Sequence, residues 1–333
     1  MKKLYTKFGI SYFITILFAI TAIIYFSIGH GSVNLLIAQI QHREQTIARS
    51  GASSIRSLLT SSADTLNVLA KNDKITSPNS QTHLLLNQVV TNWKGTSLSL
   101  IALIDSQGNV VAATSNQDTV SNLTAKSSGR EYFENGKKLL ENSFYVGKPI
   151  LPKLAGLQSK YLIPISVPVY KDGKANGILV ATFYVSDIVH EYLVPLKISD
   201  KSDIIIFNQQ GDFISSLRPE VIGLNVFEYI KQNPFLGDTI VMRRLEEGLK
   251  QNIEQKHDLV IPNLFNNKLT RTLIASSPIN IGDNKWILVV TTPVDDALNF
   301  IGPFEMRNLM YIIIIFFIVI FITLFLSKRF FKK

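Results

Sequence analysis

Two long apolar runs lie near the ends of the chain and set its organisation. Residues 8–28 include 21 positions without a charge, and residues 309–326 include another 18. An α-helix rises about 1.5 Å per residue, so each run is long enough to cross a hydrocarbon layer about 30 Å thick. The pattern predicts transmembrane helices at 8–29 and 306–327.

The segment after the first run has apolar positions at helical spacing. They recur at intervals of three or four residues, or sums of these, at Val33, Leu36, Ile40, Ile47, Ile55, Leu58, Leu66 and Leu69. No proline interrupts the segment before residues 76–80 end it. The pattern predicts one long amphipathic stalk helix over residues 30–75. Its narrow stripe could face the rest of the domain or a second copy of the chain.

A pattern of apolar runs around a polar turn occurs twice. SLIALIDSQGNVVAAT starts at Ser99 and SDIIIFNQQGDFISS starts at Ser202, which places Gly108 and Gly211 103 residues apart. Each is typical of a hairpin in which glycine adopts positive φ. A second hairpin follows in each repeat, and helical stretches lie between the two. Each repeat is therefore predicted to be a small antiparallel sheet with helices on one face.

Charge is concentrated at the two ends. The net charge is +9, and the short tails at 1–7 and 328–333 contain seven basic residues and no acidic residue. Basic tails beside spans favour the cytoplasm. We therefore expect a multi-pass protein of the plasma (inner) membrane, with both termini cytoplasmic and residues 29–308 extracytoplasmic. No basic face with interleaved aromatics is evident, so no nucleic-acid partner is expected.

The sequence does not favour two alternative interpretations, a cleaved signal peptide and an enzyme. A cleaved signal peptide would need a shorter apolar run and a small-residue cleavage site, which SIGHGSVN does not offer. Catalysis would need converging groups, yet the chain has no Cys, its five histidines are scattered, and no Walker A, G-x-G-x-x-G or G-x-S-x-G motif is present. We expect no enzyme, no catalytic or metal-binding residues and no cofactor.

Three segments, in this order, resemble the double Cache sensor domain. SGREYFENG at 128–136 resembles the Arg-x-Tyr-Phe helix start of that family, FYVGKPIL at 144–151 the strand that follows, and ISVPVYKDGKANGILVATFYVSDI the closing hairpin. Double Cache domains are tandem PAS-like extracytoplasmic modules of bacterial and archaeal chemoreceptors, sensor histidine kinases and diguanylate cyclases. The resemblance covers roughly residues 31–308.

The resemblance implies an α+β fold with two PAS-like antiparallel-sheet subdomains on a long N-terminal helix, flanked by two transmembrane helices. The membrane-distal subdomain would cover residues 76–197 and the membrane-proximal subdomain residues 198–305. In this family the distal subdomain usually holds a small-molecule pocket.

The resemblance also implies candidate ligand-binding residues on the helix start. Arg130 stands where family members often grip a ligand carboxylate, and a guanidinium offers a planar fork of donors. Tyr132 and Phe133 would form an apolar wall. The alternatives are that Arg130 pairs with a nearby glutamate or caps a loop, and that Tyr132 and Phe133 belong to the core.

The closing strand supplies the other candidates. Thr182 and Tyr184 alternate onto one strand face with Val180. Thr182 stands where the amino-acid-binding members of the family carry Asp, so an organic acid or other small anion is favoured over an amino acid. In the second repeat, Arg243 and Arg244 are expected on a solvated helix face.

These expectations describe a membrane-anchored sensor without a cytoplasmic output domain. A bound ligand would bias the stalk helix and the second span. The stalk allows a homodimer, and the output would come from a separate signalling partner or a missing module of chemotaxis, histidine kinase or cyclic-di-GMP type. The alternatives are an anchored binding protein that works with a transporter, and a structural or adhesive surface domain without a pocket.

Overall fold

The computed structural model describes residues 2–93, 96–116, 126–151, 160–232, 239–262 and 269–298, and, in the last apolar run, residues 310, 311, 313, 314, 316–318, 320 and 321. The chain divides into two compact units, residues 1–42 with 294–333 and residues 43–293. The tail at 328–333 and most of the predicted span at 306–327 lie outside the described residues. Within the described part, no helix combines the length and apolarity of a membrane span.

The helices of the chain differ widely in length. They are α1 (Lys2–Ala70), α2 (Asp73–Thr76), α3 (Ser80–Asn92), α4 (Glu131–Gly136), α5 (Val185–Ile188), α6 (Val226–Lys231), α7 (Thr239–Gln251) and α8 (Val294–Leu298). Short turns of π-helix and 3-10 helix occur at η1 (Val189–Leu193), η2 (Val194–Leu196) and η3 (Pro219–Val221).

The strands form two five-stranded antiparallel sheets. They are β1 (Leu98–Asp105), β2 (Val110–Ser115), β3 (Tyr145–Val146), β4 (Leu162–Lys171), β5 (Lys174–Tyr184), β6 (Asp203–Asn208), β7 (Phe213–Ser215), β8 (Gln255–Pro262), β9 (Leu269–Ile281) and β10 (Asn284–Pro293). The first sheet has the order β2-β1-β5-β4-β3 and the second sheet the order β7-β6-β10-β9-β8. The identical order confirms the predicted duplication.

Both predicted glycine turns are confirmed. Gly108 has φ +87° and Gly211 has φ +85°, in the left-handed region that glycine enters without a steric penalty. Each turn joins the first two strands of its sheet, so the two polar loops noted in the sequence are equivalent turns of the two sheets.

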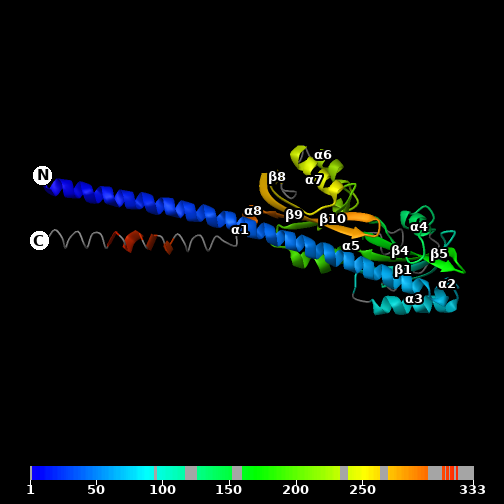
Figure 1. Cartoon of the computed structure of the whole chain (residues 1–333). Coiled ribbons are helices and arrows are strands. Elements are labelled where there is room, and N and C mark those ends of the chain that lie inside the picture. The colour runs from blue at the N-terminus through cyan, green and yellow to red at the C-terminus, as the bar shows by residue number, and fades with distance from the viewer. Residues whose placement is uncertain are drawn as a thin grey trace. The chain divides into compact units, whose positions relative to one another are not determined.

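The long helix α1 buries one side against both sheets of the 43–293 unit (Figure 1). Its buried positions include Ala48, Ala52, Ile55, Leu59, Ala63 and Leu66. The stripe read from the sequence contained Ile55 and Leu66 but missed the alanines, whose small side chains allow close approach. The stripe therefore faces the domain over this stretch, the first of its two predicted alternatives.

The predicted end of the stalk helix at residue 75 is wrong. α1 ends at Ala70, and the separate turn α2 begins at Asp73. The Asn72 side chain caps α2 by accepting a hydrogen bond from the Lys74 backbone N–H at 3.0 Å. Asparagine favours such a cap over a helix interior, which explains the break.

The helices that lie within each repeat cover one face of its sheet, as predicted, and helices that precede the repeats cover the other face. Every residue of β4 from Leu162 to Val169 is buried, which requires cover on both faces. In the first sheet, α1 and α3 cover one face and α4 the other; in the second, α1 and the pair α6 and α7 lie on opposite faces (Figure 1).

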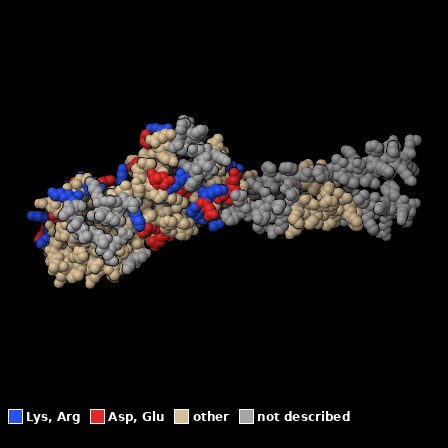
Figure 2. Space-filling view, turned by 180° about the vertical axis from the view of Figure 1, so that it is seen from behind, with Lys and Arg blue, Asp and Glu red and all other residues tan. Residues whose placement is uncertain are grey.

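Charged side chains of both signs are interspersed over the face of the described domain seen in Figure 2. Several form ion pairs within one helix, such as Lys231 with Glu228 at 2.9 Å and Lys250 with Glu246 at 2.6 Å. Strand β8, which sequence reasoning missed, adds to this surface because it lies at the sheet edge and exposes Lys256 and Asp258.

Candidate functional site

The face of the first sheet that turns away from α1 carries the two strand candidates. Pairing places Thr182 between Leu100 on β1 and Pro164 on β4. Because side chains alternate along a strand, Thr182 and Tyr184 share this face with Val180. The expected alternation is therefore present, and the two hydroxyls lie two residues apart on one surface.

Three hydroxyl groups on this face are buried without a hydrogen-bond partner. They belong to Ser166, Thr182 and Tyr184. Their residues are 0%, 6% and 4% exposed, respectively. Ser166 lies opposite Val180, so it is a diagonal neighbour of Thr182, at roughly 7–8 Å. Buried polar groups in proteins are nearly always hydrogen-bonded, so a cluster of unused hydroxyls indicates a place for a polar ligand or water.

Helix α4 lies over the same face and holds the other three candidates. Arg130 is its N-cap residue but makes no side-chain capping bond, and no ion pair of Arg130 is present among the described residues. The neighbouring carboxylate, Glu134, instead pairs with Lys137 at 2.6 Å. Among the described residues, the guanidinium of Arg130 thus makes neither the glutamate pair nor the helix-capping bond.

The two aromatic candidates on α4 differ in their surroundings. Phe133 is 2% exposed and belongs to an apolar cluster with Leu100, Ala102, Ile104, Ala113, Ile178 and Val180. Tyr132 is half-buried, and its hydroxyl donates to Ser127 Oγ at 3.2 Å. Phe133 therefore packs between α4 and the sheet as a core residue does, while Tyr132 already has a hydrogen-bond partner. Their part in ligand binding stays a prediction.

A lysine adds a cation beside this face. Lys160 places its Nζ 4.8 Å from the centre of the Tyr184 ring. Glu131 accepts a short hydrogen bond from the Tyr145 hydroxyl, and burial together with this carboxylate raises the pKa of Tyr145 to about 12. The nearby acids are thus engaged, whereas Arg130 and Lys160 remain able to meet an anion.

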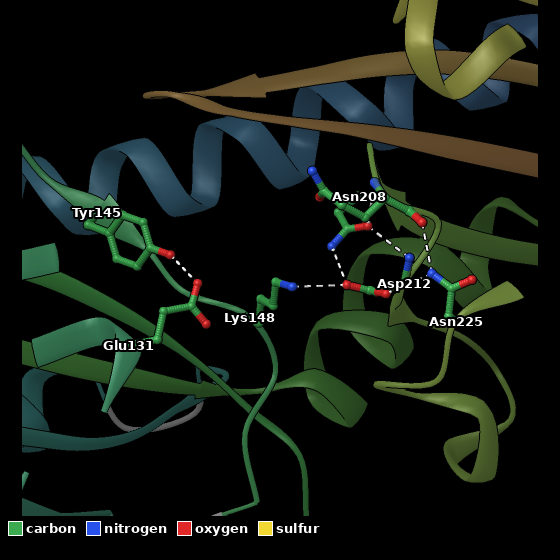
Figure 3. Close-up of polar contacts among 7 residues, drawn as sticks. Glu131, Tyr145, Lys148, Asn208, Asp212 and Asn225 are labelled. Carbon is green, nitrogen blue, oxygen red and sulfur yellow. Dashed lines mark hydrogen bonds and ion pairs between the residues drawn. The ribbon is translucent and has the colours of Figure 1, made fainter. Parts of the chain in front are cut away.

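A polar junction links the two sheets. Figure 3 shows Lys148, which follows β3, reaching Asp212 in the β6–β7 turn at 3.0 Å. Asp212 also accepts hydrogen bonds from Asn208 at 2.8 Å and Asn225 at 2.9 Å. Burial alone would raise the pKa of Asp212, but these three donors outweigh it and hold the pKa below its ordinary value.

A second contact ties the same segment to the other turn of the second sheet. The Asn284 side chain donates to the Val146 carbonyl at 2.7 Å. Because Val146 and Lys148 flank Gly147, one short segment beside the hydroxyl cluster touches both the 208–212 turn and the 282–284 turn. Residues 146–148 of the first sheet therefore contact two turns of the second sheet.

Metal chemistry has no visible basis in the described residues. No group of three or more His, Asp or Glu side chains comes together there in a way that could hold an ion. The candidate site offers hydroxyls, an arginine and a lysine, which suit hydrogen bonding and anion binding.

The sequence profile described as "Cache domain" matches residues 32–301, well over half of the chain. The chain belongs to the Cache domain family. The match covers both sheets and most of α1, in agreement with a double Cache sensor domain. No curated protein sequence matches the chain.

Solved structures of chemoreceptor and histidine kinase sensory domains share the fold. The periplasmic sensory domain of the Campylobacter jejuni chemoreceptor Tlp1 superposes with a TM-score of 0.58 at 14% identity, covering 79% of this chain and 98% of that one. The ligand-binding domain of the Pseudomonas fluorescens chemoreceptor CtaA, in complex with L-serine, gives 0.57 at 12% identity, covering 78% and 99%. The extracellular domain of the putative histidine kinase rpHK1S-Z16 gives 0.60 at 16% identity, covering 79% and 98%.

In the Cache fold Thr182 and Tyr184 lie on one face of β5, Phe133 packs against that face from α4, and Arg130 and Tyr132 lie at the start of the same helix. Sequence reasoning missed Ser166, Lys160 and the Lys148–Asp212 pair. Ser166 carried a signal, because it is the one serine inside the apolar strand ending VPVYK and therefore a candidate inward-facing hydroxyl. The other two depend on tertiary contacts that the sequence does not reveal.

Proposed function

We propose that the first-sheet subdomain of this Cache protein binds a small organic anion and thereby acts as the receiving part of a sensor. The observation that supports this most directly is the cluster of three buried, unpartnered hydroxyls at Ser166, Thr182 and Tyr184. A ligand that bonds to them would relieve an energetic penalty of about 1–3 kcal/mol for each unsatisfied group.

The charges favour an acid over an amine. Arg130 can grip a carboxylate with two parallel hydrogen bonds, and Lys160 adds a second cation beside Tyr184. A ligand ammonium would need a free carboxylate, but Glu131 and Glu134 both have partners in the described structure. A carboxylate with further hydroxyl or carbonyl groups would use both kinds of contact.

An amino acid is the second candidate. The Pseudomonas chemoreceptor domains among the similar structures are described in complex with L-serine and with GABA. Those molecules also carry a carboxylate, so the same Arg130 contact would serve. What argues against a free α-amino acid here is Thr182, a hydroxyl in place of a carboxylate.

Ligand binding would be coupled to signalling through the membrane. In this proposal residues 8–29 and 306–327 anchor the protein, residues 29–308 lie outside the inner membrane, and α1 pairs with a second copy of the chain. Binding would shift the population of two arrangements of the helices by about five- to a hundredfold for a coupling of 1–3 kcal/mol. A transporter-associated binding protein remains the competing role for the same site.

Calorimetric titration of the purified full chain tests the ligand class. We expect at least one small mono- or dicarboxylate to bind, and the amines of matched carbon skeleton not to bind. Tight binding of amines without acids would reverse the assignment, and binding of neither would favour a structural or adhesive role. Protease added to intact cells should cut the 43–293 unit and spare tags at both termini; the opposite pattern would overturn the proposed topology.

A further inference from the structure

A second pocket lies in the other subdomain, for which the sequence made no ligand prediction. It has a volume of about 140 Å³ and lies between helices α6 and α7 and the face of the second sheet that turns away from α1. Its wall is mainly aliphatic and aromatic, with Phe207, Phe213, Leu245, Leu249 and Ile274 among the lining residues. A dry apolar cavity of about 150 Å³ is known to accept a benzene-sized molecule.

The pocket occupies the place in its sheet that the hydroxyl cluster occupies in the first sheet. Ser276 lies opposite Val289 as Ser166 lies opposite Val180, and Thr291 follows Val289 as Thr182 follows Val180. Ser276 and Thr291 both line the pocket. Duplication thus preserved the same three residue types on both faces.

The polar groups of the second pocket are engaged, unlike those of the first. Ser276 Oγ accepts a hydrogen bond from the Gln255 backbone N–H at 3.2 Å, because β8 runs alongside β9 there. Gln255 Oε1 is 3.1 Å from His257 Nε2. The middle of this pocket therefore offers apolar contact rather than free hydrogen-bonding groups.

Helix α7 brings a cation to the rim. Arg244, Leu245, Gly248 and Leu249 share one helical face and line the pocket. Arg243 belongs to the outer face, where it lies 3.9 Å from Glu247. Arg244 is exposed, as the sequence predicted for both arginines, but it is also part of the pocket wall. Gly248 leaves room for the Gln255 side chain, because a Cβ at this position would lie 2.7 Å from Gln255 Oε1.

Among the described residues, the side chains lining the pocket that can carry a positive charge are Arg244 and His257, and no Asp or Glu lines it. Asp203 lies on the same sheet face, but three strands from His257, about 14 Å by strand spacing, and it does not line the pocket. The pocket thus joins an apolar interior to a basic end.

We propose that this pocket is a second small-molecule site, which takes a compact apolar carboxylate of about the size of benzoate. The ring or short alkyl body fills the space above Ile274 and Leu249, and the carboxylate meets Arg244 and His257. This site is separate from the one in the first sheet, so the protein would respond to two chemically different acids.

His257 supplies an internal reporter. Burial lowers its pKa, and the nearby Arg244 lowers it further, so the imidazole is neutral at neutral pH. A carboxylate bound beside it favours the charged form and raises its pKa. This shift would not occur if the molecule bound elsewhere on the chain.

The test uses purified full-length chain, titrated calorimetrically with benzoate, benzamide and benzylamine. We expect benzoate to bind, benzamide to bind at least about tenfold more weakly, and benzylamine not to bind. Arg244→Gln should weaken benzoate binding about tenfold or more, whereas Arg243→Gln, its neighbour on the outer face, should leave it unchanged. In histidine-selective NMR, benzoate should raise the His257 pKa.

Three outcomes would overturn the proposal. These are no benzoate binding at about 10 mM, equal effects of Arg243→Gln and Arg244→Gln, or benzoate binding that Thr182→Val abolishes and Arg244→Gln does not. The last result would place benzoate in the first sheet and would support the function proposed for that sheet. A lipid acyl chain as the true occupant would appear as loss of benzoate binding only when lipid is added, and would count against a soluble carboxylate.

Discussion

The two sheets have the same strand order and the same arrangement of Val, Ser and Thr. Their hydroxyl groups nevertheless differ in hydrogen bonding. In the first sheet Ser166 and Thr182 are buried without partners. In the second sheet Ser276 is bonded to the Gln255 backbone and Thr291 lines an apolar pocket. The equivalent faces of the two sheets therefore differ in the hydrogen bonding of their hydroxyls.

The edge strands of the two sheets differ in length, but both reach the serine. β3 has two residues, and its Tyr145 lies opposite Ser166 as Gln255 of β8 lies opposite Ser276. β8 has eight residues that pair along β9, and it adds Leu259 and Ile261 to the wall of the second pocket. The longer edge strand therefore extends the apolar wall, but strand length does not explain the different bonding of the two serines.

The largest predicted effect concerns the helix that both sheets share. Where α1 crosses the second sheet, Gln45 bonds the Ser276 carbonyl at 2.9 Å, and Glu44 beside it is fully buried. Burial raises the pKa of Glu44 to about 8 from an ordinary 4.5. Thr292 lies near and opposes this shift, but its hydroxyl bonds Ser202 at 2.8 Å and neither carboxyl oxygen of Glu44 has a partner of good geometry.

A carboxyl whose pKa is higher in the folded than in the unfolded state makes the free energy of unfolding larger at low pH than at high pH. Its contribution is complete below pH 4.5 and is lost as pH rises through about 8. Glu44→Gln should remove this dependence and raise the free energy of unfolding above pH 8 by an amount on the order of 4 kcal/mol. Urea denaturation at several pH values measures it, with Glu254→Gln at the exposed surface as control. An unchanged pH profile in Glu44→Gln would contradict the assignment.

A smaller predicted effect distinguishes the first-sheet face from the equivalent face of the second sheet. Thr182→Val replaces an unpartnered hydroxyl with a methyl group of the same shape, so the unliganded protein should be as stable as before or more stable by about 1 kcal/mol. Affinity for the first-sheet ligand should fall about tenfold, the value of one hydrogen bond. Calorimetry and denaturation of the same variant measure both.

The matched variant in the second sheet is Thr291→Val. It occupies the equivalent strand position, so it should leave binding in the first sheet unchanged. If the two variants weakened that binding equally, or if Thr182→Val weakened nothing, the hydroxyl cluster would not be the ligand site.

Much of this fold was predictable because it depends on local patterns. The two hairpin turns required glycine at Gly108 and Gly211, and apolar alternation identified most strands. Strand alternation placed Thr182 and Tyr184 on one face, which the pairing of β5 bears out. Strand β8 was not predicted because QKHDLVIP mixes charged with apolar residues, as an edge strand does when one side is solvated.

The features that could not be predicted from the sequence depend on contacts between distant segments. Arg243 and Arg244 are indistinguishable in MRRLEEG, and only the packing of α7 separates an outer-face arginine from a pocket-lining one. Glu44 looks like one more polar residue of an amphipathic helix, yet it is buried against β10. The burial of a charge or a hydroxyl is decided by the partner surface, which periodicity does not describe.

The smallest predicted effect tests how the two sheets are joined. Lys148→Met removes an ion pair whose side chains are 51% and 21% exposed, so it should lower the free energy of unfolding by less than about 1 kcal/mol. Asp212→Ala should cost more, about 1–3 kcal/mol, because it also strands the donors of Asn208 and Asn225. Lys231→Met, which breaks the exposed pair with Glu228, is the control for surface charge. A larger loss in Lys148→Met than in Asp212→Ala would mean that the lysine holds the sheets together by more than this pair, and the junction would then be the main coupling element rather than a local cap.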